Sequence, residues 1–402
     1  MKKFLALVLA LAMTLALAAC GGNSQQNSST PNAGQKEDAQ PPADSQGGGA
    51  SGTIKIGGIG PLTGSTAQYG IATDEGAKIA IEEINALGGI QFELNGQDDE
   101  ADGEKGVNAY NNLMDWGMQI LYGCTTSGSC AAVAAESFND RVFQLTPSAS
   151  STTVTEGHDN VFQLCFTDPN QGKTAADFIK DNALATKVAV IYNNSDDYST
   201  GIYQGFKAEA EAVGLEIVST TTFPDDTTTD FSAQITDAYN NGAEMIFLPI
   251  YYTPASNILI QASQKGYEFS YFGCDGLDGI LTLEGFDTAL AEGVYVLTPF
   301  DTASDAAVSF IEKYKAATGG EPNQFAADGY DCIYALYAAC QEAGITEDMT
   351  ADQVCEALIA VFTDSGFSVD GLTGSGMQWG ANGEVSKDPL IVQITGGAYV
   401  NQ

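Results

Sequence analysis

Short apolar segments alternate with amphipathic segments along most of this chain, and that alternation restricts the folds open to it. The apolar segments that we expect to be strands are 53–59, 118–122, 142–145, 187–192, 216–221, 245–250, 269–273 and 293–297. The segments that we expect to be helices are the one ending at Leu87, then 131–139, 200–213, 231–240 and 255–265. This order is typical of an α/β fold with parallel sheets covered on both faces. The repeats are too many for one sheet, so we expect two doubly wound lobes rather than one barrel.

The chain begins with the pattern of a secretory signal. Lys2 and Lys3 precede an apolar run at 4–19, and this run of 16 residues is shorter than the roughly 20 that a membrane-spanning helix needs. The run closes with Leu-Ala-Ala-Cys ending at Cys20, which resembles the bacterial lipobox, where cleavage precedes a cysteine that receives a diacylglycerol. We expect a signal peptide at 1–19 and a lipid on Cys20. An ordinary cleaved signal with an incidental cysteine is the alternative.

Residues 20–52 form a segment rich in Gly, Ser, Asn, Gln and Pro, with almost nothing to build a core. Such a composition is typical of a flexible tether. A lipid at one end and a folded body at 53–402 indicate an extracytoplasmic protein, anchored to the outer face of the cell membrane.

The charge balance and the single histidine exclude several classes of protein. Asp and Glu number 52 against 15 Lys and Arg, for a formal charge of -37, whereas a nucleic-acid binder needs a basic face. His158 is the one histidine of the chain and lies in a polar segment, which argues against Ser/His/Asp and most metal chemistry. No glycine-rich loop ends in Gly-Lys-Ser/Thr, so there is no P-loop. We therefore expect no enzyme and no cofactor.

Two motifs resemble ligand sites and fail in detail. The glycines at 58–64 follow a strand, but the third is one place late for a dinucleotide fingerprint, and Pro61 removes a backbone donor. The acidic run at 98–103 resembles a calcium loop, but its twelfth position is Ala109 where a bidentate Glu is needed. We expect neither a nucleotide nor a metal.

An odd number of cysteines follows the tether, so at least one of them is a free thiol. Cys332 and Cys340 are eight apart on one expected helix, about 12 Å by rise, and cannot pair with each other. Cys124 and Cys130 are close enough to bridge across a turn. We favour buried small hydrophobes for most of the set. The seven are Cys124, Cys130, Cys165, Cys274, Cys332, Cys340 and Cys355.

Several blocks together resemble a known family. The first reads Gly-Pro-Leu-Thr-Gly-Ser-Thr-Ala-Gln-Tyr-Gly at 60–70, and the others are at 76–77, 81–90, 145–150, 231–235 and 272–276. They are similar to the leucine/isoleucine/valine-binding proteins of ABC transporters, which have the type I periplasmic-binding fold. The resemblance covers essentially the whole body from Thr53 onwards.

That resemblance implies two Rossmann-like lobes joined by three hinge crossovers around a ligand cleft. One lobe would comprise 53–167 and 299–374, and the other 168–298 and 375–402. The crossings would fall in turn-prone sequence, the third of them at 371–376. Ligands in such lobes bind outside the carboxyl ends of the strands.

The resemblance also implies which residues hold the ligand. A serine would bind the ligand carboxylate, and a following loop would supply an amide and a hydroxyl. An aromatic residue would line the side-chain pocket, the other lobe would contribute two tyrosines, and an acid there would bind the ammonium. In that order these are Ser127; Ser148 and Ser150; Tyr69; Tyr198 and Tyr251; and Asp275. Taken singly, the serines are equally compatible with helix caps, the tyrosines with core packing and the aspartate with a turn.

The sequence departs from the family at three places. The family often has Glu where this chain has Asp275, and a disulfide of some members would join Ala101 and Thr126, which is impossible here. A glycine also interrupts the hydroxyl residues at 127–129.

We therefore expect a monomeric lipoprotein that delivers a branched-chain or otherwise apolar amino acid to an ABC permease. ATP hydrolysis would belong to separate subunits. The alternatives are an amide, urea or aromatic acid as ligand, a sensor with the same fold, and, more distantly, a lipoprotein hydrolase, which lacks a second histidine.

Overall fold

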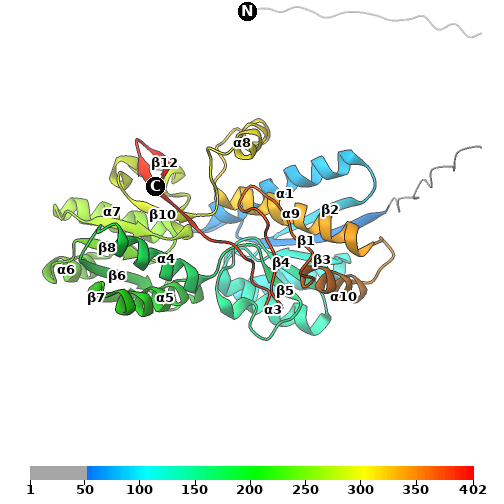
Figure 1. The fold of residues 1–402 in the computed structure, drawn as a ribbon, viewed down its shortest axis with the longest axis horizontal. Coiled ribbons are helices and arrows are strands. Elements are labelled where there is room, and N and C mark those ends of the chain that lie inside the picture. The colour runs from blue at the N-terminus through cyan, green and yellow to red at the C-terminus, as the bar shows by residue number, and fades with distance from the viewer. Residues whose placement is uncertain (1–51) are drawn as a thin grey trace, which may run out of the picture. The chain divides into compact units, whose positions relative to one another are not determined.

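The computed structural model describes residues 52–402, which form two sheets, one parallel and one mixed, each with its own helices (Figure 1). The predicted signal peptide, Cys20 and most of the predicted tether lie outside the described residues. Within 52–402, no helix has the length and apolar character needed to cross a bilayer.

The first sheet has five strands in the order β2-β1-β3-β4-β5, and all neighbouring strands are parallel. Its strands are β1 (Thr53–Gly60), β2 (Gln91–Asp98), β3 (Ile120–Gly123), β4 (Phe143–Thr146) and β5 (Val161–Gln163). Its helices are α1 (Ala67–Leu87), α2 (Gly103–Trp116), α3 (Ser127–Asp140), α8 (Asp305–Thr318), α9 (Gln324–Ala343) and α10 (Ala351–Phe362).

Alternate side chains of these strands enter two separate cores. Ile120 and Tyr122 pack with α1, α9 and α10, whereas Leu121 packs on the opposite face with α2 and α3. This period of two is the expected geometry of a strand, and it explains why β3 is apolar throughout. Figure 1 shows α1 and α9 on one side of the sheet and α3 on the other.

The second sheet has seven strands in the order β12-β11-β10-β9-β8-β6-β7. Its strands are β6 (Lys187–Asn193), β7 (Glu216–Phe223), β8 (Met245–Leu248), β9 (Ser270–Gly273), β10 (Tyr295–Thr298), β11 (Leu390–Thr395) and β12 (Ala398–Asn401). Its helices are α4 (Asp168–Asp181), α5 (Asp197–Val213), α6 (Ser232–Asn240) and α7 (Tyr252–Lys265). β11 is antiparallel to β10, and β12 is antiparallel to β11, which differs from the purely parallel sheets expected from the sequence.

The chain passes between the sheets three times. It leaves β5 for α4, leaves β10 for α8, and returns to the second sheet at β11. The third passage lies later than the predicted 371–376, because Met377 and Trp379 still pack in the first-sheet core and Trp379 Nε1 donates to Gln163 O at 2.7 Å. The lobe boundaries as a whole remain predictions.

All seven cysteines of the folded body are buried and unpaired. Cys332 and Cys340 both lie on α9, as predicted, and Cys124 and Cys130 form no disulfide. Burial raises the pKa of the Cys124 thiol, which keeps it protonated. Their role is that of small core residues.

Candidate functional site

A small cavity lies where the carboxyl ends of strands from both sheets face each other. β3 leads into Thr125–Ser127, β4 into Ser148, β8 into Tyr251 and β9 into Asp275. The cavity is lined by Tyr69, Thr125, Thr126, Ser127, Ser148, Tyr198, Tyr251, Asp275, Gly276 and Phe325. Six of the seven residues predicted to bind ligand are therefore brought together; Ser150 is not in this lining.

The lining is almost closed to solvent. Tyr69 is 1% exposed and Ser148, the most exposed of the predicted residues, is 7% exposed. A ligand held here would exchange its water shell for protein groups, so each of its charges needs a partner in the wall.

Aromatic rings form one part of the wall. Tyr198 and Tyr251 stack with ring centroids 5.0 Å apart, and Tyr69 lies edge-on to Tyr251 at 5.6 Å. Phe325, from the first turn of α9, completes the group at 4.3 Å from Tyr69. Rings packed in this way offer an apolar surface of fixed shape.

Asp275 supplies a carboxylate from the second sheet. Its Oδ1 accepts hydrogen bonds from Tyr198 Oη at 2.7 Å and from the Gly276 amide at 2.8 Å. Burial raises the pKa of this carboxyl to about 6, and the hydrogen bond from Tyr198 opposes the shift. Its ionised form therefore lacks a full counter-charge, which a ligand cation would supply.

The N-terminus of α3 supplies the opposite electrostatic environment from the first sheet. Thr126 is the N-cap, makes no side-chain capping bond, and its buried Oγ1 has no partner among the described residues. Ser127 Oγ lies 3.2 Å from the Ser151 amide, from which it accepts a hydrogen bond. Free amides in the first turn and the helix dipole both favour an anion at this end.

The two other predicted serines have their hydroxyl protons engaged. Ser148 Oγ donates to Thr125 O at 2.7 Å, and Ser150 Oγ donates to Asp168 Oδ1 at 2.6 Å. Neither hydroxyl has a proton left for a ligand carboxylate, although both oxygens have lone pairs. The ligand roles of all seven predicted residues remain predictions.

Sequence reasoning missed four lining residues: Thr125, Thr126, Gly276 and Phe325. The threonines lie directly before α3. A hydroxyl residue at the N-cap of a helix is a sequence pattern from which a polar lining residue here can be predicted. Phe325 comes from more than 150 residues further along the chain than Ser148, and no local pattern connects the two.

The family profile described as periplasmic binding protein matches residues 53–398. The chain belongs to that family. The resemblance to the leucine/isoleucine/valine-binding proteins is confirmed by curated relatives, two of which are a Leu/Ile/Val-binding protein homologue from Brucella melitensis and BraC3, a Leu/Ile/Val-binding protein from Rhizobium johnstonii. The Brucella protein is 30% identical over 74% of this chain and 81% of its own length. The Rhizobium protein is 31% identical over 76% of this chain and 83% of its own length.

Solved structures confirm the type I fold of this periplasmic binding protein. LivJ from Streptococcus pneumoniae, a branched-chain amino acid transporter protein in complex with isoleucine, has a TM-score of 0.78 and 29% identity over 87% of this chain and 98% of its own. LivK, a leucine-binding protein from Thermotoga maritima, has a TM-score of 0.78 and 27% identity over 87% and 97%. A benzoate complex from R. palustris, at 20% identity, has a TM-score of 0.76 over 87% and 95% and supports the fold alone.

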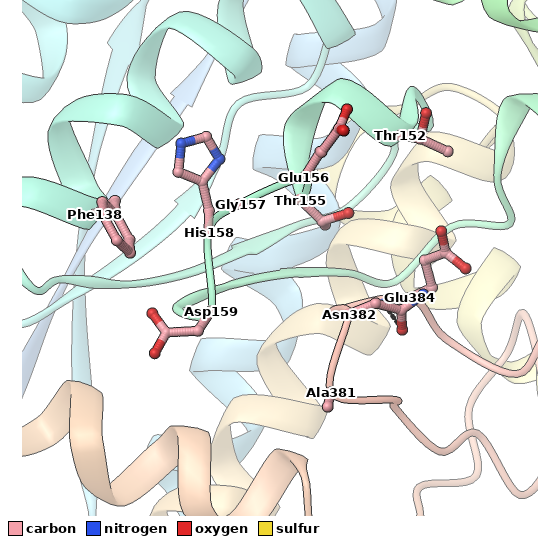
Figure 2. Close-up of a pocket in the computed structure, with 10 residues that line it drawn as sticks. All are labelled: Phe138, Thr152, Thr155, Glu156, Gly157, His158, Asp159, Ala381, Asn382 and Glu384. Carbon is pink, nitrogen blue, oxygen red and sulfur yellow. Dashed lines mark hydrogen bonds between the residues drawn. The ribbon is translucent and has the colours of Figure 1, made fainter.

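His158 lies in a separate surface pocket of this periplasmic binding protein (Figure 2). Its Nδ1 is 3.3 Å from Val154 O, and its ring lies edge-on to Phe138. Glu156, Asp159 and Glu384 also line this pocket, which shares no residue with the cavity. The described residues contain no cluster of three or more acidic, histidine or cysteine side chains arranged to hold a metal.

Proposed function

We propose that this periplasmic binding protein captures a small apolar α-amino acid, a branched-chain one in particular, by closure of its two lobes. One observation carries the proposal: a buried carboxylate at Asp275 and the free N-terminus of α3 face the same enclosed, aromatic-walled cavity. An amino acid has an ammonium for the first, a carboxylate for the second and a side chain for the rings. Asp275, with the shorter side chain, would replace the glutamate found in many relatives.

The mechanism would be hinged closure without a covalent step. Contacts from the ligand to both lobes favour the closed form over the open form, and an ABC permease would bind that closed form. Hydrolysis of ATP would take place on separate subunits of the transporter. The protein would act outside the cytoplasm as a monomer held by a lipid on Cys20.

A screen of thermal stability against candidate ligands tests the ligand class. Leucine, isoleucine, valine, acetamide, urea, benzoate and 4-hydroxybenzoate are compared at equal concentrations. A ligand at 100 times its dissociation constant should add about 2.7 kcal/mol to the free energy of unfolding. Stabilisation by an amide or an aromatic acid but by no amino acid would overturn the proposal.

Aromatic acids are the second candidate class, because solute-binding proteins of the same fold bind benzoate and 4-hydroxybenzoate. The cavity argues against them here. Such a ligand has no ammonium, so the buried Asp275 would remain without a cation and would repel a second carboxylate nearby.

The sensor and hydrolase alternatives make different predictions. A sensor would bind the same ligand, so only transport measured in cells that lack the protein separates it from an importer. A hydrolase would need an acid–base partner for a nucleophile, and the single histidine lines the pocket of Figure 2 rather than the cavity.

The lipid anchor has its own test, because Cys20 lies outside the described residues. Cys20→Ser should abolish labelling by a radioactive fatty acid and leave the chain uncleaved or released. Labelling that persists in the serine variant would place the lipid on another residue.

A further inference from the structure

The two lobes contact each other through side chains that lie outside the cavity. Thr253 Oγ1, in the first turn of α7, donates to Ser65 O at 2.9 Å. Thr282 Oγ1, at the end of a short 3₁₀ segment (Ile280–Thr282), lies 2.7 Å from Gln68 Oε1. Of the two acceptors, which belong to the other lobe, Ser65 lies just before α1 and Gln68 lies in its first turn. None of these four residues lines the cavity.

Tyr69, which lines the cavity, makes a third contact between the lobes. Tyr69 Oη donates to Gly276 O and accepts from the Tyr252 amide at 3.3 Å. Its ring is also edge-on to that of Tyr252, with centroids 5.0 Å apart. The first turn of α1 is therefore bonded to three separate segments of the second lobe.

Gly279 makes this close approach possible. A Cβ added there would lie 3.0 Å from Gln68 Oε1 and 3.2 Å from Tyr252 Cδ1, and the residue has a φ of +108° that other residues rarely adopt. A larger residue would separate the segments that Gln68 and Thr282 join.

On another part of the interface, Thr153 Oγ1 lies 3.5 Å from Asp197 Oδ2, at the outer limit of a hydrogen bond.

We propose that the Ser65–Thr253 and Gln68–Thr282 pairs form a latch that sets how firmly the lobes close, and thereby the affinity and residence time of the ligand. This inference rests on the proposed function, because it concerns closure around the same cavity. A contact that exists only between closed lobes contributes to the closing equilibrium, and closing contributes to the observed dissociation constant. Because the latch does not touch the ligand, it should affect all ligands by the same factor.

The variants Thr253→Val and Thr282→Val remove the two hydroxyls and keep the shape of the side chains. A neutral hydrogen bond contributes enough that each loss should weaken binding about 2- to 10-fold, mainly through a faster dissociation rate. Thr236→Val is the matched control, because its hydroxyl donates to Ser232 O at 2.6 Å within α6, in its own lobe. Stopped-flow measurements with leucine and valine give the two rates for each protein.

The expected result is that the dissociation rate rises in both latch variants, by the same factor for leucine and valine. The rate should not change in the control. Dissociation rates within 1.5-fold of the parent, or a loss that differs between the two amino acids, would overturn the latch.

A cross-linking arm separates failure of the latch from failure of the proposed function. Gln68→Cys combined with Thr282→Cys should be joined by a short bismaleimide reagent, whereas Gln68→Cys combined with Thr236→Cys should not, as read by the mass of the peptide pair. If the cross-link forms in a protein that binds no amino acid, the contact between the lobes is supported and the proposed ligand class is wrong. Absence of the cross-link in a protein that does bind would refute the latch.

Discussion

Ser150 Oγ donates a 2.6 Å hydrogen bond to Asp168 Oδ1, and Asp168 N in turn donates to Ser150 O at 2.9 Å. This double contact joins the loop after β4 to the first residue of α4, just where the chain first passes between the sheets. A serine hydroxyl has one proton, so the bond to Asp168 leaves Ser150 able only to accept from a ligand. That orientation suits an ammonium rather than a carboxylate, but Ser150 does not line the cavity, so its role towards a ligand stays a prediction.

If Ser150 holds the ligand, as the family resemblance implies, Ser150→Ala should weaken amino-acid binding by about 1–3 kcal/mol, the cost of leaving an ammonium proton unpaired. Binding of the corresponding keto acid should change little. Ser137→Ala is the matched control, because Ser137 Oγ donates to the buried Gln144 Oε1 at 2.7 Å in the last turns of α3 and does not line the cavity. Calorimetry gives the affinities and urea denaturation the stabilities. Equal losses of stability in both variants, with affinity intact, would make Ser150 purely structural.

Asp275→Asn should abolish most of the affinity for an amino acid while the fold survives. The substitution keeps the shape, so the hydrogen bond from Tyr198 can persist, but it removes the charge that would pair with the ammonium. Loss of one partner of a desolvated charge pair costs about 2–5 kcal/mol, roughly thirty- to several thousand-fold in affinity.

A ligand without the amine, such as the matching keto acid or fatty acid, should lose little with Asp275→Asn. Calorimetry of both proteins with both ligands forms a double cycle. Amino-acid affinity within about threefold of the parent, less than 1 kcal/mol, would make Asp275 a turn residue.

The same carboxyl predicts how binding depends on pH. Burial raises the pKa of Asp275 to about 6, above that of an ordinary aspartate, so the group becomes protonated as the pH falls through 6. Only the ionised form pairs with an ammonium. Affinity for leucine should therefore be nearly constant above pH 7 and fall about tenfold from pH 7 to pH 5. Asp275→Asn should remove this dependence, and a parent whose affinity is the same at pH 5 and pH 7 would contradict it.

Much of the fold follows from local sequence, and the parts that do not have physical causes. β6 and β8 have strongly apolar sequences and were predicted almost to the residue, because both faces of each strand are covered. β2 (Gln91–Asp98) was missed because it is an edge strand with a half-polar sequence. β11 and β12 were missed because short strands at the end of a chain carry little periodic signal.

The candidate site also contains residues that the sequence locates and residues that it does not. Tyr69, Ser127 and Asp275 each follow a recognisable strand or motif, so the family resemblance locates them. Phe325 reaches the cavity only because α9 packs along α1, a contact between segments about 250 residues apart. Long-range packing of this kind leaves no local pattern in the sequence.

A buried ion pair beside the crossings supplies the last prediction. Lys387 Nζ lies 3.2 Å from Asp328 Oδ1, and the side chains are only 2% and 3% exposed. Lys387 also donates to Leu164 O at 3.2 Å and to Thr373 Oγ1 at 2.7 Å, so it connects the segment before the first crossing with the segment before the third. Burial raises the pKa of Asp328 to about 7, and the lysine opposes that shift.

Lys387→Met should lower the free energy of unfolding by about 3–5 kcal/mol, because it leaves Asp328 buried without its cation. Adding Asp328→Asn to the same chain should recover much of that loss, since the remaining group is then neutral. Lys315→Met is the matched control: Lys315 pairs with Glu321 at 2.8 Å on the surface, where such a pair contributes about 0–1 kcal/mol. Urea denaturation at pH 7.5 measures all four proteins. A loss in Lys387→Met no larger than that in Lys315→Met would show that this buried pair does not stabilise the fold.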